Sequence, residues 1–238
     1  MPSKITSDIL FRVFRIYVGD YSGTSFTMEH NGIQYLITAK HLFESVGFPN
    51  ETIVGVLQNH KIINLSFTIE YCGDPVDIAI LKPNPYLLLS KTTPAEFKID
   101  GTTYGEEAFF VGYPLDYDIT LMNMPKTFSP IPFVKRCLVS CFLEKDLIAL
   151  DGINNPGFSG APVFRVDGKK TIVIGVISGY RYNASYIYQS VESSEIKTLL
   201  YTKENTGIIY AYSIKPVVDF LNKKYLSKGN TTVNKCDK

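Results

Sequence analysis

The sequence predicts an all-β protein, built as a barrel or a sandwich, that ends in one α-helix. Short runs of strand-like alternation or unbroken apolar character recur along most of the chain. Only two helical patterns stand out, a short turn at His41–Val46 and a longer segment that begins after Ser213. Many short strands with a single terminal helix are typical of an all-β domain.

In the N-terminal half, residues typical of turns separate the expected strands. Asn31-Gly32 favours a tight hairpin turn between Ser25–Met28 and Gln34–Ala39. The other strands of this half are expected at Phe11–Val18, Thr52–Leu57, Ile62–Glu70 and Asp77–Leu81. The segment Lys82–Tyr104 has several prolines and little periodicity, so we expect it to cross between two halves of the molecule.

In the C-terminal half the clearest strand is Thr171–Ile177, which is apolar from Ile172 onward and should therefore be buried on both faces. Further strands are expected at Ala108–Gly112, Val134–Leu143, Asp146–Asp151, Ala161–Val166 and Gly207–Tyr212. The Tyr- and Ser-rich segment Arg181–Asn205 could be a lid, a partner site or a loop, and we favour a loop. Pro216 suits the first turn of the terminal helix, and the polar tail from Ser227 is expected to be disordered.

Bulk composition excludes several classes of protein. The 238 residues are 45% hydrophobic and carry a net charge of +1, which argues against a basic nucleic-acid-binding face. No apolar run approaches the roughly 18 residues of a membrane span, and charged residues interrupt the N-terminus where a cleaved signal would lie. We therefore expect a cytoplasmic protein whose four cysteines are free thiols, with no metal and no cofactor.

The loop Asn154–Pro162 carries the residues best suited to nucleophilic catalysis. Ser159 is the candidate nucleophile, and a serine hydroxyl needs an adjacent base and a site for the developing oxyanion. Gly157 permits backbone conformations closed to other residues, so the N–H groups of Gly157 and Ser159 could turn toward one point. A Gly-x-Ser-Gly tetrapeptide also occurs in ordinary turns, and the rest of the chain has to decide between the two interpretations.

The candidate base and acid come from the first half. His41 lies where an apolar strand ends, a place where a rigid scaffold presents working side chains, whereas His30 and His60 lie among polar residues. Asp77 immediately precedes an apolar strand, and burial there demands a partner. Asp74 is the rival acid, but the proline that follows it is typical of a turn.

The order of these residues separates the hydrolase classes. No histidine follows Ser159, as an α/β-hydrolase requires, and all four cysteines follow His41, against the order of a papain-like enzyme. A subtilisin-like order would need an earlier acid such as Asp8 or Asp20, and neither lies in the strand–helix alternation of that fold. The remaining order, histidine, aspartate, serine, is that of chymotrypsin-like proteases.

Three segments, Thr38-Ala39-Lys40-His41, Asp77-Ile78-Ala79-Ile80-Leu81 and Asn155-Pro156-Gly157-Phe158-Ser159-Gly160, resemble motifs of the trypsin-like serine peptidase superfamily, especially its bacterial HtrA-like branch. The resemblance implies two six-stranded antiparallel β-barrels, chymotrypsin-like, with a C-terminal α-helix. It implies a first barrel in residues 1–90, a linker at 91–104, a second barrel with the helix in 105–226 and a disordered tail at 227–238.

The resemblance also assigns roles to the site residues. His41 would take the proton of Ser159 and return it to the leaving amine, Asp77 would hold the imidazole tautomer, and the N–H groups of Gly157 and Ser159 would form the oxyanion hole. The residues that would line the pocket for the substrate side chain before the scissile bond are Ile153, Asn154, Ser178, Gly179 and Tyr180. No acid is among them, so we expect a small or medium apolar side chain there rather than Lys or Arg.

Two departures from the family pattern matter. Phe158 stands where activatable proteases carry an aspartate, so we expect no zymogen cleavage at Arg15; its ring should either cover the cleft or pack under the loop. No PDZ-like segment follows the peptidase region in this sequence.

The predicted function is that of a serine endopeptidase that hydrolyses a peptide or protein substrate through an acyl-enzyme. The alternatives are a protease-like binding module with a silent triad and a latent enzyme that an activating protein partner switches on. The sequence leaves the oligomeric state open.

Overall fold

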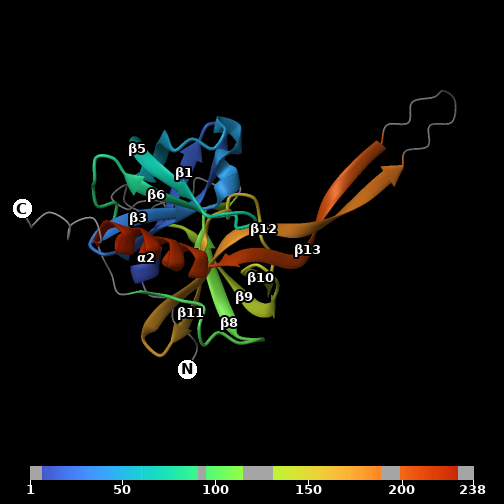
Figure 1. Cartoon of the computed structure of the whole chain (residues 1–238). Helices are drawn as coiled ribbons and strands as arrows, with labels where there is room; N and C mark the ends of the chain where they lie inside the picture. The colour runs from blue at the N-terminus through green and yellow to red at the C-terminus, as the bar shows by residue number, and fades with distance from the viewer. Residues whose placement is uncertain (1–6, 60, 91–94, 115–130, 189–198, 230–238) are drawn as a thin grey trace, which may run out of the picture.

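The computed structural model describes residues 7–59, 61–90, 95–114, 131–188 and 199–229. His60, Cys236 and most of the predicted tail therefore lie outside the described residues. Two β-barrels are visible in Figure 1, with the C-terminal helix lying across them and a two-stranded ribbon projecting to one side. The two closed six-stranded antiparallel barrels and the terminal helix confirm the predicted fold class.

The first barrel closes in the order β1-β2-β3-β6-β5-β4. A tight turn at Asn31 and Gly32, both with positive φ, joins β2 to β3 as the sequence predicted. Its interior holds Ile16, Leu36 and Phe67, all fully buried. Its elements are β1 (Val13–Val18), β2 (Tyr21–His30), β3 (Ile33–Thr38), the 3₁₀ helix η1 (Lys40–Val46), β4 (Glu51–Gln58), β5 (Lys61–Tyr71) and β6 (Ala79–Pro83).

The second barrel follows the order β11-β8-β9-β10-β13-β12 and closes through the pairing of β11 with β12. A short strand, β7, adds to β12 in parallel within the segment predicted to be the inter-barrel linker. The barrel interior holds Phe110, Val139 and Ile174. Its strands are β7 (Glu96–Phe97), β8 (Glu107–Gly112), β9 (Phe133–Phe142), β10 (Leu147–Asp151), β11 (Pro162–Asp167), β12 (Lys170–Tyr188) and β13 (Leu199–Ser213).

A third apolar cluster joins the two barrels to the terminal helix α2 (Lys215–Gly229). Phe26 and Ile80 enter it from the first barrel, Val111 from the second, and Val217 and Leu221 from the helix. The apolar run of β12 is buried on both faces, as predicted, because it faces this cluster on one side and the second barrel interior on the other.

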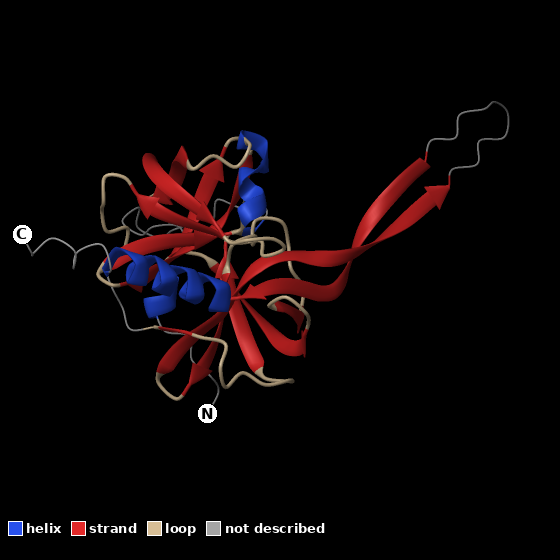
Figure 2. Ribbon diagram, in the orientation of Figure 1, coloured by secondary structure: helices blue, strands red, loops and turns tan. Residues whose placement is uncertain are grey.

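Three expectations differ from the structure. The segment Arg181–Asn205 is not a plain loop, because β12 and β13 continue through it as a paired ribbon up to Tyr188 and from Leu199 (Figure 2). The terminal helix runs to Gly229, past the start of the predicted tail. The short helix α1 (Ser7–Leu10) was not expected, and it places Ile9 in the inter-barrel cluster.

Candidate active site

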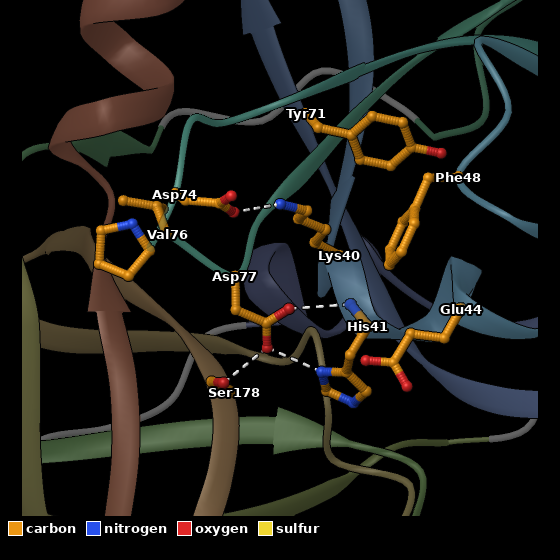
Figure 3. A pocket seen from close by; sticks show the side chains of 10 residues that line it. Lys40, His41, Glu44, Phe48, Tyr71, Asp74, Val76, Asp77 and Ser178 are labelled. Atoms are coloured by element: carbon orange, nitrogen blue, oxygen red, sulfur yellow. Dashed lines mark hydrogen bonds and ion pairs between the residues drawn. The ribbon is translucent and has the colours of Figure 1, made fainter.

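The three predicted catalytic residues come from three separate parts of the fold. His41 lies in the first turn of η1, Asp77 just before β6, and Ser159 in the turn before β11. Figure 3 shows His41 and Asp77 facing each other, with Ser178 of β12 on the far side of the carboxylate.

The Asp77 carboxylate binds His41 twice. Oδ2 lies 2.7 Å from the imidazole Nδ1, and Oδ1 accepts the backbone N–H of His41 at 2.8 Å. Ala39, the residue before η1, has no side chain that could cap this helix. The Asp77 carboxylate therefore satisfies a backbone donor that the start of a helix leaves open. One side chain thus fixes both the helix and the orientation of the ring.

The rival acid, Asp74, does not contact His41. Its side chain is exposed and pairs with Lys40 at 2.6 Å. The hydrogen bond from Lys40 and, to a smaller extent, the lysine charge lower the pKa of Asp74.

Ser178 contacts both Asp77 and Ser159, a role that the sequence did not lead us to expect. Its hydroxyl donates to Asp77 Oδ2 at 2.5 Å, and its backbone carbonyl accepts the hydroxyl of Ser159 at 3.3 Å. Among the described hydrogen bonds none joins Ser159 Oγ to His41 Nε2, so Ser178 is the link between the serine turn and the His41–Asp77 pair. The position of a polar residue directly after the apolar run of β12 was the available signal.

The Ser159 turn has the shape of a type II β-turn. The N–H of Phe158 donates to the carbonyl of Asn155 at 3.3 Å, with Pro156 and Gly157 between them. Gly157 has φ +96°, which the third position of this turn type requires and which glycine adopts without strain. Among the described hydrogen bonds, none uses the N–H of Gly157 or of Ser159.

The same turn is held from the first barrel by Thr24 of β2, which is fully buried. The Thr24 hydroxyl donates to the carbonyl of Gly157 at 2.7 Å and accepts the N–H of Tyr113 at 3.0 Å, while the Thr24 N–H donates to the carbonyl of Ser159 at 2.8 Å. A Cβ at Gly160 would lie 2.1 Å from the Thr24 carbonyl, so glycine is needed for this close approach.

The Phe158 ring packs under the turn and does not cover the cleft. It is fully buried and meets Phe110 edge-on at 4.9 Å between ring centroids. Lys135 lies over the ring at 5.7 Å and donates to the side chain of Asn155 at 2.8 Å. Arg15 is buried in the middle of β1, where it pairs with Thr24 of β2.

Two opposing effects act on the pKa of His41. Burial alone would lower it, but the hydrogen bond to Asp77 and the charges of Asp77 and Glu44 outweigh burial and raise the pKa above its ordinary value. Because Nδ1 faces the carboxylate as a donor, the neutral ring presents Nε2 as its proton acceptor.

A pocket of about 780 Å³ lies beside His41 and Asp77 (Figure 3). It combines carboxylates with the rings of Phe48 and Tyr71, and Lys40 lies 5.7 Å from the centre of the Phe48 ring. Its lining consists of Lys40, His41, Glu44, Phe48, Tyr71, Asp74, Pro75, Val76, Asp77 and Ser178.

Only one of the five residues predicted to bind the substrate side chain lines this pocket. Ser178 alone of the five lines the pocket, whereas Ile153 is 60% exposed. Asn154 is buried, and its amide donates to the carbonyl of Gly179 at 3.4 Å, which ties the loop before Ser159 to β12. Tyr180 continues the same strand and is half-buried.

The other histidines and the cysteines lie apart from the site or outside the described residues. His30 is bonded to its neighbour Asn31 in an exposed turn. Burial raises the pKa of the Cys72 and Cys137 thiols to about 12, so both are protonated at neutral pH. In the described part of the chain, no group of three or more His, Cys, Asp or Glu residues is arranged to hold a metal ion.

Comparison with known proteins identifies the family. The model of the trypsin-like peptidase domain matches residues 23–176, a range that includes His41, Asp77 and Ser159. The chain therefore belongs to the trypsin-like peptidase family. No curated protein matches the sequence.

Solved structures of proteases share the fold. The Rv3671c protease of M. tuberculosis, in its inactive form, aligns with TM-score 0.56 and 16% identity over 91% of this chain and 90% of its own. The serine endoprotease from Yersinia pestis (TM-score 0.56, 17% identity) and the HtrA-type protease AlgW with a tripeptide (0.57, 18%) are each matched over 91% of this chain. This chain covers 64% and 60% of those two proteins, and at such identities the likeness establishes the fold alone.

No helix in the described ranges is both long enough and apolar enough to cross a membrane.

Proposed function

We propose that the chain is a serine endopeptidase with His41 as general base, Asp77 as its orienting acid and Ser159 as nucleophile. The observation that carries the proposal is the double contact of the Asp77 carboxylate with His41, through the imidazole at 2.7 Å and the backbone N–H at 2.8 Å. An imidazole fixed in this way keeps Nε2 free to accept a proton, which a serine nucleophile requires.

The proposed reaction has two halves. Ser159 Oγ attacks the carbonyl carbon of the scissile bond while Nε2 of His41 takes its proton. The tetrahedral intermediate collapses, the C–N bond breaks, and His41 returns the proton to the leaving amine. Water then attacks the acyl-enzyme with His41 again as base, which releases the acid and restores Ser159.

A serine nucleophile also needs a site for the oxyanion, and the turn around Ser159 would supply it. The N–H groups of Gly157 and Ser159 have no partner among the described hydrogen bonds, and the carbonyls of both residues are fixed by Thr24. Donors held in place before the reaction stabilise the charge that develops in the transition state without reorganising.

Ser159 has one adjustment to make. Its hydroxyl donates to the carbonyl of Ser178, the residue whose own hydroxyl binds Asp77. The proposed reaction requires this hydroxyl to turn from the Ser178 carbonyl to the imidazole, and catalytic hydrogen bonds commonly tighten only when substrate is bound.

The test is covalent labelling with a fluorophosphonate probe, in which the activated serine displaces fluoride from phosphorus. We expect the wild-type protein and the control variant Ser140→Ala, at an exposed position of β9, to be labelled at equal rates. We expect Ser159→Ala and His41→Ala to stay unlabelled while their circular dichroism spectra match the wild type.

Labelling of Ser159→Ala at the wild-type rate would overturn the choice of nucleophile. A folded wild-type protein that is not labelled would overturn the proposal of an active enzyme and favour the binding module or the latent form.

A further inference from the structure

Lys135 on β9 carries a half-buried charge that the proposed reaction does not use. Its ammonium group donates to the side-chain oxygen of Asn155 at 2.8 Å and lies 5.7 Å from the centre of the Phe158 ring. Burial lowers the pKa of Lys135, and no acid among the described residues forms an ion pair with it. A charge that is partly removed from water without a carboxylate partner is costly, so its contacts with the residues before Ser159 need an explanation.

Lys135 contacts both ends of the turn Asn155–Phe158. The N–H of Phe158 closes this turn on the carbonyl of Asn155. The ammonium group of Lys135 binds the side chain of the first residue and lies over the ring of the fourth. Between these two contacts lies the central peptide, which carries the N–H of Gly157, one of the two proposed oxyanion donors.

A turn of this composition has two accessible forms. Types I and II share the closing hydrogen bond, but the torsion before the central peptide differs by about 150° between them, so its N–H points in nearly opposite directions. Proline suits the second position of both types, and glycine at the third position permits type II. Gly157 has φ +96°, the type II form. The direction of the Gly157 N–H therefore depends on which of the two forms is the more stable.

Asn155 by itself favours the other form. Asparagine is preferred at the first position of a type I turn, and its side-chain oxygen commonly accepts the backbone N–H two residues further on. In this turn that donor is the N–H of Gly157. An Asn155 oxygen without another partner would therefore compete with the oxyanion for the same N–H.

The contact with Lys135 removes this competition. An ammonium group has only donors, so the atom of Asn155 that faces it is the side-chain oxygen, the same atom that would otherwise bind the Gly157 N–H. We propose that Lys135 is a positioning residue, which holds the Asn155 oxygen and so keeps the N–H of Gly157 available for the oxyanion. This inference rests on the proposed function and adds a residue to the same site.

The first test is the variant Lys135→Met, which keeps an unbranched side chain and removes the donor and the charge. We expect kcat for a peptide substrate to fall by at least about tenfold, toward the roughly 10²-fold cost of one lost oxyanion donor, while KM changes little. Fluorophosphonate labelling should slow in parallel, because the phosphoryl oxygen of the probe needs the same donors. Circular dichroism checks that the variant is folded.

The matched control is Arg136→Met, at the next position of the same strand. It removes an equal charge from an exposed side chain that pairs with Glu107 and makes no described contact with the turn. Its kcat should stay within a few-fold of wild type.

The second test distinguishes a competing acceptor from a general loosening of the turn. Asn155→Ala removes the oxygen that would capture the Gly157 N–H, so this variant alone should keep kcat within a few-fold of wild type. In the double variant Lys135→Met/Asn155→Ala, kcat should return to the value of Asn155→Ala. If Lys135 only stiffened the turn, the double variant would be at least as slow as Lys135→Met.

Fluorophosphonate labelling of the wild type separates this inference from the proposed function. A folded wild-type protein that is not labelled would overturn the proposed function. Normal labelling of the wild type together with an unchanged kcat in Lys135→Met, or with a double variant as slow as Lys135→Met, would overturn the role of Lys135 alone. A rise in KM at constant kcat would overturn that role too, and would assign the ammonium group to an acidic group of the substrate.

Discussion

At the scale of single residues, the two acids near His41 differ in what they touch. Asp77 accepts hydrogen bonds from His41 and Ser178, whereas Asp74 pairs with Lys40 at the surface. We expect Asp77→Asn to reduce kcat by about 10⁴-fold, as the same change does in the chymotrypsin-type triad, because an amide favours the wrong imidazole tautomer. Steady-state hydrolysis of a peptide substrate measures this.

Asp74→Asn is the matched control, since it removes a carboxylate of the same type from the same pocket. Exposed ion pairs contribute little, so kcat should stay within a few-fold of wild type. A large loss in Asp74→Asn with a small one in Asp77→Asn would mean that the acid was assigned wrongly.

The raised pKa of His41 makes activity depend on pH in a defined direction. His41 accepts a proton only when neutral, so the acid limb of kcat/KM should lie above the ordinary histidine pKa of 6.5. The Glu44 charge adds to the rise, and Glu44→Gln should move the limb to lower pH, most clearly at low salt. The control is Glu51→Gln, at an exposed acid outside the charges that act on His41.

The same shift has the opposite sense for stability. A histidine whose folded pKa is raised stabilises the fold fully below its unfolded pKa, and that contribution is lost as pH rises through the folded pKa. We therefore expect activity to rise over the pH range in which this contribution to stability is lost. An acid limb that lies below pH 6.5, or that does not move in the variant Glu44→Gln, would contradict the assignment of His41 as the titrating base.

The site residues that could be predicted are those whose chemistry is local in the sequence. An acid before an apolar strand and a histidine after one are visible as patterns, and the structure brings Asp77 and His41 into contact. The polar position of Ser178 after the apolar run of β12 was visible in the sequence, but its contact with the Asp77 carboxylate was not, because that contact depends on a side-chain direction fixed by barrel closure. The roles of all these residues in catalysis remain predictions that the labelling and kinetic experiments test.

At the scale of elements, barrel strands were predictable because burial on one or both faces imposes an apolar pattern. The outer parts of β12 and β13 carry no such pattern, because their described side chains are largely exposed. Without a buried face, alternation of apolar and polar residues gives no stabilisation there. The sequence Arg181–Asn205 therefore resembled a loop. Cross-strand backbone pairing, which no residue pattern reports, extends both strands.

At the scale of the whole molecule, the site exists only because the two barrels meet. His41 and Asp77 belong to the first barrel and Ser159 to the second, and Thr24 of the first barrel holds the Ser159 turn through two backbone groups, the carbonyls of Gly157 and Ser159. Phe158 is buried against Phe110 beneath this turn, at the position where the resemblance implies an aspartate in activatable family members. We therefore expect the Ser159 turn to be formed without any cleavage of the chain.

Thr24→Val tests this coupling, because valine keeps the shape and removes the hydroxyl. The carbonyl of Gly157 and the N–H of Tyr113 would lose their partner, and a buried unpaired group costs about 1–3 kcal/mol. Turning the Gly157–Phe158 peptide would relieve that cost, and the change in the Gly157 torsion angles would also displace the Gly157 N–H from the proposed oxyanion site. We expect kcat to fall by about 10²-fold, the scale of one lost oxyanion donor, with KM for a short peptide little changed.

Two further variants distinguish loss of this coupling from general destabilisation. Thr24→Ser keeps the hydroxyl and should restore most of kcat. Ser25→Ala, on the same strand as Thr24, removes a buried hydroxyl that donates to the carbonyl of Phe14 in β1 and makes no contact with the turn. Ser25→Ala should therefore lower the unfolding temperature and leave kcat close to wild type. Equal kcat in Thr24→Val and Ser25→Ala would show that the turn keeps its shape without the hydroxyl, and that the second barrel alone determines the oxyanion site.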